Sequence, residues 1–208
     1  PRVAQLGKAL AAQAAPALAA EGRFLLGIAA ATHNQARAGL ALLDEAAALH
    51  PRADIHAQRA RLLIMLRRDA DAARAAADAE ALGPHDALSF DTIANVHARL
   101  GDHAAAARNF AAAVAQDPAN PAYRFNLALS YGFLGRTADA AAAHEAVLAM
   151  QPANGRVHLA LAGLARATPD ANHVARMEAV LAARPGADDA LRIRYALAKE
   201  YEDLGQHE

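Results

Sequence analysis

The stretch ALSFDTIANVHARLGDHAAAARNFAAAVAQDPAN, residues 87–120, decides the fold of this chain. Its apolar residues recur at helical spacing, and Gly101 divides it into two segments. Glycine adopts the left-handed conformation that ends a helix without strain, and Asp102 then suits the N-cap of a second helix. The stretch therefore predicts two antiparallel helices joined by a tight turn.

The pattern recurs along the chain with a period in the mid-thirties. Pro84, Pro118 and Pro152 lie 34 residues apart. Pro51 lies 33 residues before Pro84, and Pro185 lies 33 residues after Pro152. A fixed period of this length is typical of stacked helical hairpins, in which each repeat packs only on its neighbours. We find no alternating apolar segment that predicts a strand.

Small and aromatic residues hold fixed positions within each repeat. Counted from Ala87, Ala94 and Ala106 occupy positions 8 and 20, Phe110 occupies position 24 and Pro118 occupies position 32. This resembles the tetratricopeptide repeat (TPR), which has small residues, an aromatic residue and Pro at these positions. Small residues let helices approach closely, and bulky residues fill the remaining gaps. The resemblance implies an all-α, right-handed superhelical solenoid of antiparallel helix hairpins.

The repeat register divides the whole chain. It predicts an N-terminal helix or half repeat at 1–19, repeats at 20–52, 53–86, 87–120 and 121–154, a degenerate repeat at 155–187, and the first helix of a truncated repeat at 188–208. Because the sequence given stops where a second helix should start, we expect the native polypeptide to continue, and we expect an uncovered apolar stripe along Leu191, Tyr195 and Ala198.

Composition excludes several classes of protein. The net charge of -1 lacks the basic excess of nucleic-acid binders, and no apolar run reaches the length of a membrane span. We expect neither nucleic acid nor membrane as a partner, and a cytoplasmic location. Basic charge is almost all arginine, with Lys8 and Lys199 as the lysines. Together with the alanine excess, this indicates a bacterial source.

No arrangement of residues predicts catalysis, a metal or a cofactor. Ser89 and Ser130, the two serines, lie in no nucleophile motif. There is no HExxH motif. His33, His50, His85 and His173 lie near expected turns and are predicted to face solvent. The other histidines replace bulky packing residues and are predicted to be half-buried, namely His56, His97, His103, His144, His158 and His207.

Arg59 breaks the packing pattern. It occupies repeat position 7, where other repeats have apolar residues such as Ile93 and Leu127. A buried charge is costly unless it is paired. We therefore expect the guanidinium to reach solvent, or to pair with a nearby acid such as Asp54 or Asp91.

The TPR resemblance implies a concave groove lined by the first helix of each hairpin. The groove residues that it implies are Gln58, Arg61, Asn95, Arg99, Asn126, Arg156 and Arg192. Three of them (Asn95, Asn126 and Arg156) match part of the carboxylate clamp of TPR co-chaperones, but Asp91 and Ala160 replace a lysine and an arginine of that clamp. We expect an extended peptide or partner domain in the groove. Chaperone binding and a groove without a ligand are the alternatives.

The C-terminal segment carries a second resemblance. MEAVLAARPG at 177–186 and DDALRIRYALAKEYEDLGQHE at 188–208 resemble the junction segment of bacterial TPR-containing sulfotransferases, chiefly through YEDLG at 201–205. This implies the alternative that the chain is the N-terminal TPR arm of a larger sulfotransferase, non-catalytic by itself, with a C-terminal catalytic domain in the same polypeptide. No catalytic residue is assigned, and whether the parent protein is an enzyme stays open.

Overall fold

The computed structural model describes residues 2–206, and within them the chain forms twelve α-helices and no strand. One isolated antiparallel bridge pairs Thr168 with Ala171. The predicted all-α class is confirmed. The chain comprises two compact units, an N-terminal unit (Pro1–Asp117) and a C-terminal unit (Pro118–Glu208).

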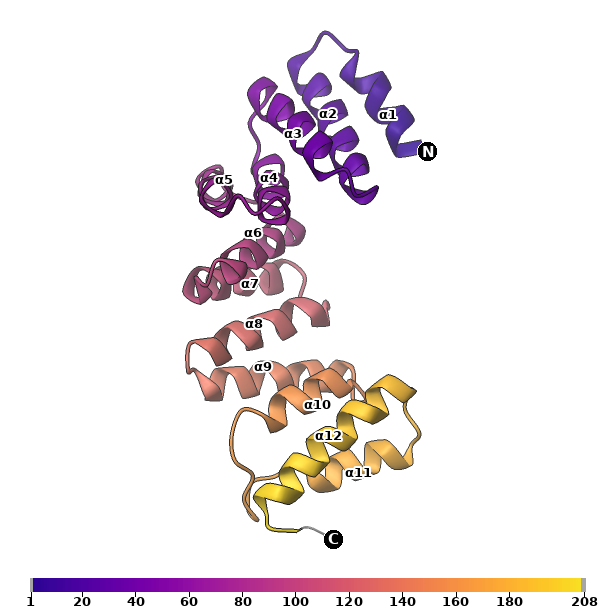
Figure 1. Ribbon diagram of the computed structural model, residues 1–208, viewed down its shortest axis with the longest axis vertical. Coiled ribbons are helices and arrows are strands. Elements are labelled where there is room, and N and C mark those ends of the chain that lie inside the picture. The colour runs from indigo at the N-terminus through magenta and orange to yellow at the C-terminus, as the bar shows by residue number, and fades with distance from the viewer. Residues whose placement is uncertain (1, 207–208) are drawn as a thin grey trace. The chain divides into compact units, whose positions relative to one another are not determined.

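The N-terminal unit is built from helical hairpins (Figure 1). Helix α2 pairs with α3, α4 with α5, and α6 with α7, while α1 packs on α2 and the first helices α4 and α6 pack on each other. The bounds are α1 (Arg2–Ala11), α2 (Pro16–Thr32), α3 (Ala36–Leu49), α4 (Ala53–Met65), α5 (Asp69–Ala81), α6 (Ala87–Arg99) and α7 (His103–Gln116). Helices α4 and α6 begin at the expected positions 53 and 87, whereas α2 begins at Pro16, ahead of the expected position 20.

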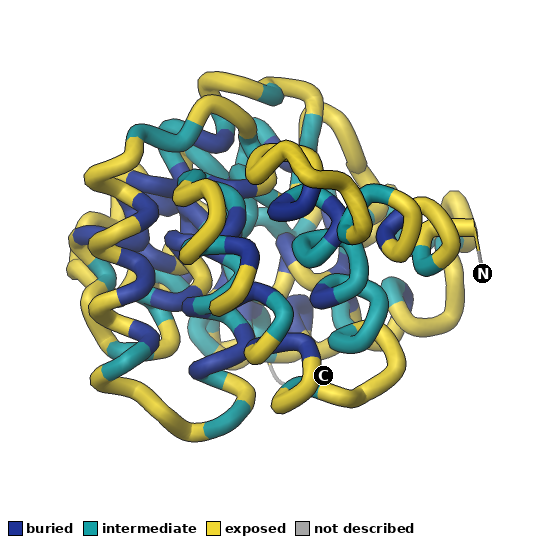
Figure 2. Tube along the Cα trace, turned by 90° about the horizontal axis from the view of Figure 1, so that it is seen from above, coloured by how far each residue is buried: buried dark blue, intermediate teal, exposed yellow. Residues whose placement is uncertain are grey.

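Alanine dominates the packing of these hairpins. In the α6/α7 hairpin Ala94, Ala106 and Ala113 are completely buried, and Phe110 is 2% exposed. Side chains this small let the helix backbones approach closely, and the phenyl ring fills the space that they leave. Figure 2 shows the result, in which buried and exposed positions alternate along the helices.

The turns inside the hairpins use the left-handed backbone conformation. Gly101 ends the first helix of its hairpin with φ +84° and Gly135 does so with φ +70°. The equivalent turn after α4 places Arg67 at φ +60°, a conformation that costs a residue with a Cβ about 1–2 kcal/mol. After Gly101, the Oδ1 of Asp102 accepts the backbone N–H of Ala105 at 2.9 Å and caps α7, as predicted.

The C-terminal unit begins with a regular hairpin and then departs from the pattern. Its helices are α8 (Pro121–Phe133), α9 (Thr137–Met150), α10 (Gly155–Ala162), α11 (Val174–Ala182) and α12 (Ala187–Asp203). The first helix of the degenerate repeat, α10, has only eight residues and is followed by a non-helical segment at 163–173. Helix α12 packs against both α10 and α11. Helices α8 and α10 begin at the expected 121 and 155, and α12 begins at Ala187, one residue before the expected 188.

Side chains of α12 bind the backbone of this irregular region. The Oδ1 of Asp189 accepts the N–H of Gly155 at 3.0 Å, and the Oδ2 of Asp203 accepts the N–H of Ala167 at 2.8 Å. Lys199 forms an ion pair with Asp203 at 2.7 Å. The N–H of Gly155 at the start of α10 and that of Ala167 in the non-helical segment have no partner within a helix, and the two carboxylates satisfy them.

A partly buried ionic cluster joins α9, α11 and α12. Glu200 is 1% exposed, and its carboxylate accepts the backbone N–H of His173 at 2.6 Å and contacts His173 Nδ1 at 2.7 Å. Arg176 on α11 donates two hydrogen bonds to Glu145 on α9, at 2.6 and 3.1 Å. The guanidinium of Arg176 lowers the pKa of Glu145. His173, which we expected to face solvent, is therefore half-buried and paired.

The histidines at packing positions are buried or half-buried, as predicted, with His144 and His158 each 1% exposed. Burial lowers the pKa of both. His33, His50 and His85 are exposed, as expected, and His207 lies outside the described residues.

Arg59 is paired, but not with the expected partners. It is half-buried, and its Nε lies 2.7 Å from the Oδ1 of Asp44 on α3. The expected partner Asp54 instead binds Arg52, at 2.7 Å. The expected pairing with a nearby acid therefore holds, but the acid lies on the preceding second helix α3 and not on the first helices α4 or α6.

Among residues 2–206, no helix combines the length and the apolar character that crossing a membrane would require.

Candidate functional site

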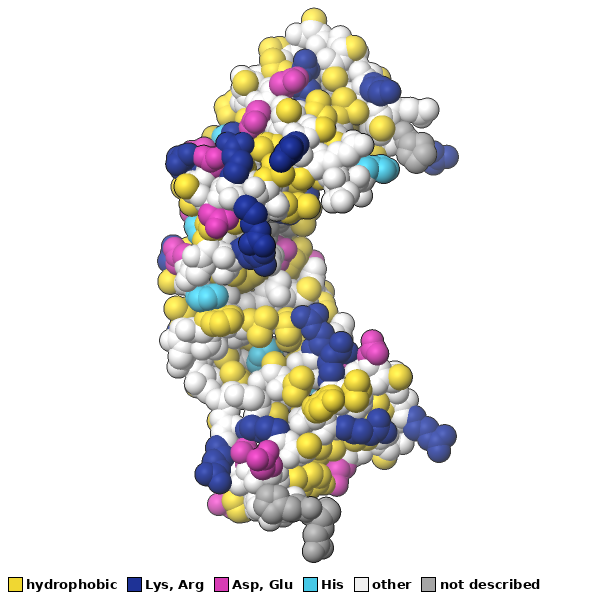
Figure 3. Space-filling model, in the orientation of Figure 1, with side chains coloured by type: hydrophobic (Ala, Val, Ile, Leu, Met, Phe, Trp, Pro, Cys, Tyr) yellow, Lys and Arg dark blue, Asp and Glu magenta, His cyan; other side chains and the backbone are white. Residues whose placement is uncertain are grey.

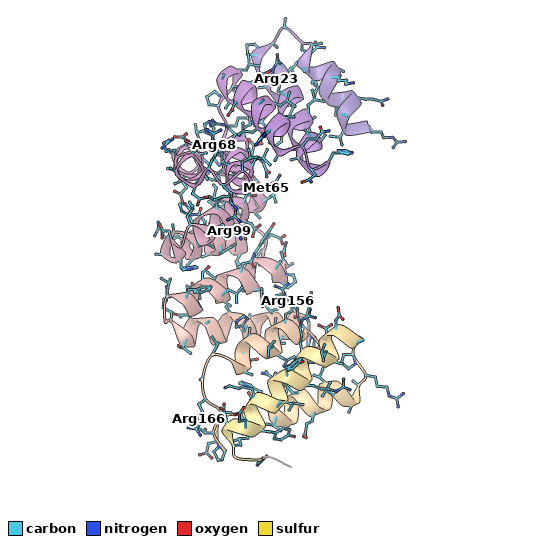
Figure 4. The ribbon with its side chains drawn as sticks, viewed as in Figure 1. Arg23, Met65, Arg68, Arg99, Arg156 and Arg166 are labelled. Atoms are coloured by element: carbon cyan, nitrogen blue, oxygen red, sulfur yellow. The ribbon has the colours of Figure 1, made fainter. Side chains whose placement is uncertain are left out.

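A groove in the N-terminal unit is formed by the first helices of three successive hairpins. It encloses about 1010 Å³. Its lining comes from α2, α4, the turn after α4, and α6: Phe24, Leu25, Ile28, Gln58, Arg61, Ile64, Met65, Arg67, Leu88, Asp91, Thr92, Asn95, Val96 and Arg99. Figure 4 labels Met65 on α4 and Arg99 on α6, which lie on neighbouring helices at this site.

Aliphatic side chains form the floor of the groove. Leu25, Ile28 and Ile64 are half-buried, whereas Met65 and Leu88 are 49% and 59% exposed. These apolar residues were not among the predicted site residues. The repeat register nevertheless pointed to four of them, because Leu25, Ile28, Met65 and Leu88 occupy the same repeat positions as polar residues we selected. A search for polar groups alone passed over them.

The predicted residues Gln58, Arg61, Asn95 and Arg99 all line this groove. The Nε of Arg61 donates to the Oε1 of Gln58 at 2.7 Å, and burial lowers the pKa of Arg61. The side-chain amide of Asn95 donates to the carbonyl of Asp91 at 2.7 Å, within its own helix. Asn95 therefore offers its side-chain oxygen as an acceptor, while one of its two amide N–H groups is already engaged.

Positive charge exceeds negative charge along the groove. Arg61, Arg67 and Arg99 line it, against the single carboxylate of Asp91. In Figure 3, basic groups lie among apolar side chains over α4 and α6. An apolar surface with several guanidinium groups is suited to binding rather than to acid–base chemistry.

The other three predicted residues belong to the C-terminal unit. Asn126 is half-buried on α8. The guanidinium of Arg156 lies 4.7 Å from the ring centroid of Phe125, and Arg192 donates to the carbonyl of Asp188 at 3.3 Å. A joint site of these three residues with Asn95 stays a prediction.

The residues considered for catalysis have structural partners. The hydroxyl of Ser89 donates to the carboxylate of Asp86 at 2.6 Å, and that of Ser130 donates to the carbonyl of Asn126 at 3.1 Å. Both serines are buried. Over residues 2–206, no three histidine or acidic side chains are grouped so that they could hold a metal ion.

No family model and no curated protein matches this chain, but solved structures do. The TPR protein YrrB, described as having an unusual peptide-binding site, is 14% identical, with a TM-score of 0.67 over 98% of this chain and 95% of that chain. MamA from Desulfovibrio magneticus RS-1 is 15% identical, with a TM-score of 0.63 over 88% and 96%. TTC0263, a thermophilic TPR protein of Thermus thermophilus, is 18% identical, with a TM-score of 0.55 over 86% and 99%. The fold of this chain is therefore that of TPR proteins.

Proposed function

We propose that this chain is a protein-interaction scaffold that holds a peptide segment or a partner domain in the groove of the N-terminal unit. The observation that carries this proposal is the groove of about 1010 Å³ lined by three first helices. The similar structures support it, because one of them is described as a TPR protein with a peptide-binding site.

The groove offers the two kinds of contact that peptide recognition needs. Met65 and Leu88 present apolar surface to solvent, and covering that surface is favourable. The side-chain oxygen of Asn95 can accept a backbone N–H of an extended segment, while the aliphatic floor takes side chains of the same segment. Affinity would then come mainly from the floor and orientation from the polar groups.

A peptide-display selection against the whole chain tests this function. The double variant Met65→Ser with Leu88→Ser removes apolar contact area and adds no charge. We expect it to weaken binding of the selected peptides by about 1–3 kcal/mol. Both side chains are largely exposed, so the fold should persist.

Leu82→Ser is the matched control, since Leu82 is 41% exposed and lies outside the groove lining. It should leave the affinity unchanged. Equal binding by the groove variant and the parent chain would move the site elsewhere and contradict the proposal.

The second candidate function is that of a non-catalytic arm beside a sulfotransferase domain in the same polypeptide. It rests on the resemblance of residues 177–208 and on the exposure of Leu191 and Tyr195 on α12, at 52% and 63%. The coding region beyond Glu208 tests it. A strand followed by a phosphosulfate-binding loop would support the proposal, and an immediate stop codon would contradict it.

A further inference from the structure

The arginines of the groove differ from other arginines of the same unit in their partners. Arg23 pairs with Glu45 at 2.8 Å, Arg52 pairs with Glu21 at 2.6 Å, and Arg59 pairs with Asp44 at 2.7 Å. Within residues 2–206, none of the groove arginines Arg61, Arg67 and Arg99 forms an ion pair with a carboxylate. Their charge is therefore available to a ligand.

Arg61 is the most informative of the three. It is half-buried, and its one side-chain hydrogen bond in the described structure goes to the neutral amide of Gln58. A guanidinium removed from water without a counter-ion carries a desolvation cost. A carboxylate brought by a ligand would reduce that cost, and its two oxygens match the planar fork of arginine.

We propose that the peptide segment held in this groove is both acidic and apolar. This inference rests on the proposed function of the groove as a peptide site. Its leucine-like side chains cover the floor at Leu25, Ile28 and Met65, and its carboxylates pair with Arg61 and Arg99. A lysine-rich segment would meet the same guanidinium groups as a like charge and is disfavoured.

The lining favours a peptide over a nucleic acid. Single-stranded nucleic acids bind through stacking of bases on exposed aromatic rings. The groove lining contains one aromatic residue, Phe24, and the guanidinium of Arg52 already lies over that ring, at 5.5 Å from its centroid. The remaining floor is aliphatic and suits aliphatic side chains.

Three synthetic peptides with the same leucine positions test the proposal on the whole chain. They carry glutamate, glutamine or lysine at every other position. We expect the glutamate peptide to bind about tenfold more tightly than the glutamine peptide, as two partly desolvated ion pairs would give. We expect the lysine peptide to bind most weakly, and the preference for glutamate to shrink as salt is added.

The double variant Arg61→Gln with Arg99→Gln should abolish the preference for glutamate. Arg37→Gln with Arg108→Gln is the control of equal charge, since both residues are exposed outside the groove, and it should keep the preference. Should the half-buried Arg61 prove necessary for folding, Arg99→Gln alone, at an exposed position, should reduce the preference about threefold.

Equal affinity for the three peptides, or a preference that survives the loss of both groove arginines, would overturn the acidic partner and leave the peptide site standing. Polyglutamate or polyuridylate binding as tightly as the leucine–glutamate peptide would also overturn it, because the groove would then recognise charge alone. If none of the three peptides binds at millimolar concentration, the acidic partner is excluded. The peptide-display selection then tests separately whether the groove binds any peptide.

Discussion

The α6/α7 hairpin and the region from α10 to α12 solve the same packing problem with different chemistry. In the hairpin, buried alanines and Phe110 bring two full helices together. In the second region, α10 is short, and carboxylates of α12 accept backbone N–H groups of α10 and of the following segment. The regular repeat is held by small and aromatic side chains, whereas in the repeat with a shortened helix carboxylates accept backbone N–H groups that have no helical partner.

The two regions should therefore fail under different perturbations. Close packing is sensitive to a change of volume. Buried charges are sensitive to the loss of a partner and to pH. Three predictions test this contrast.

The largest effect is expected from Phe110→Ala in the regular hairpin. Phe110 is 2% exposed, and deleting a buried phenyl ring leaves a cavity among alanines that are too small to collapse into it. We expect a loss of about 3–5 kcal/mol in the free energy of unfolding, measured by urea denaturation. Leu88→Ala, at a position that is 59% exposed on the same hairpin, should change stability by less than about 0.5 kcal/mol. A small effect of the first variant would show that this hairpin is not held by packing.

A smaller loss is expected from Glu200→Leu in the irregular region. Leucine is similar in size to glutamate, but it leaves the backbone N–H of His173 without its acceptor. We expect about 1–3 kcal/mol of local destabilisation, seen as faster hydrogen exchange of the first amides of α11. Glu202→Leu on the same helix is the control, because Glu202 is exposed. Unchanged exchange after loss of Glu200 would mean that α11 is held by apolar contacts alone.

The smallest effect is expected from mild acid. His144 and His158 have pKa values lowered by burial from the usual 6.5, so between their folded and unfolded pKa values the unfolded chain binds more protons. Their contribution is complete above about pH 6.5 and is lost as the pH falls toward the folded pKa values. Hydrogen exchange of the C-terminal unit should therefore become faster as the pH is lowered from about 7 to about 5.5, after correction for the intrinsic pH dependence of exchange.

The variant His144→Leu should flatten this pH dependence, while His85→Leu, at an exposed position, should leave it unchanged. Titration of Glu145 does not contribute to the change in exchange over this pH range. Its pKa is lowered from 4.5 by Arg176, so its contribution is lost only in stronger acid. A C-terminal unit equally protected at both pH values would contradict the role given to the buried histidines.

The sequence was a good guide wherever the repeat is regular. The starts of α4, α6, α8 and α10 follow from the proline period and the small residues, because these encode local packing that recurs every repeat. The contacts of His173 with Glu200 did not follow, since the two residues are 27 positions apart and belong to no repeated pattern. The repeat boundaries themselves stay a prediction.

The candidate site was half predictable for a similar reason. The register placed Gln58, Arg61, Asn95 and Arg99 on one surface, and all four line the groove. The apolar floor was missed because exposed leucine and methionine cannot be told from core residues by composition. Which arginines have partners also depends on contacts between hairpins, which spacing does not reveal.

Arg67 shows how selection can act on a single turn. Where the α6/α7 and α8/α9 hairpins use glycine and the α2/α3 hairpin uses Asn34, this hairpin keeps an arginine in the left-handed conformation, and its side chain lines the groove. Stability alone would favour glycine there, so we expect the arginine to be retained for its place in the groove and not for the fold. Among relatives of this chain, those that bind the same partner should retain a basic residue at the turn, and those that have lost the partner should revert to glycine.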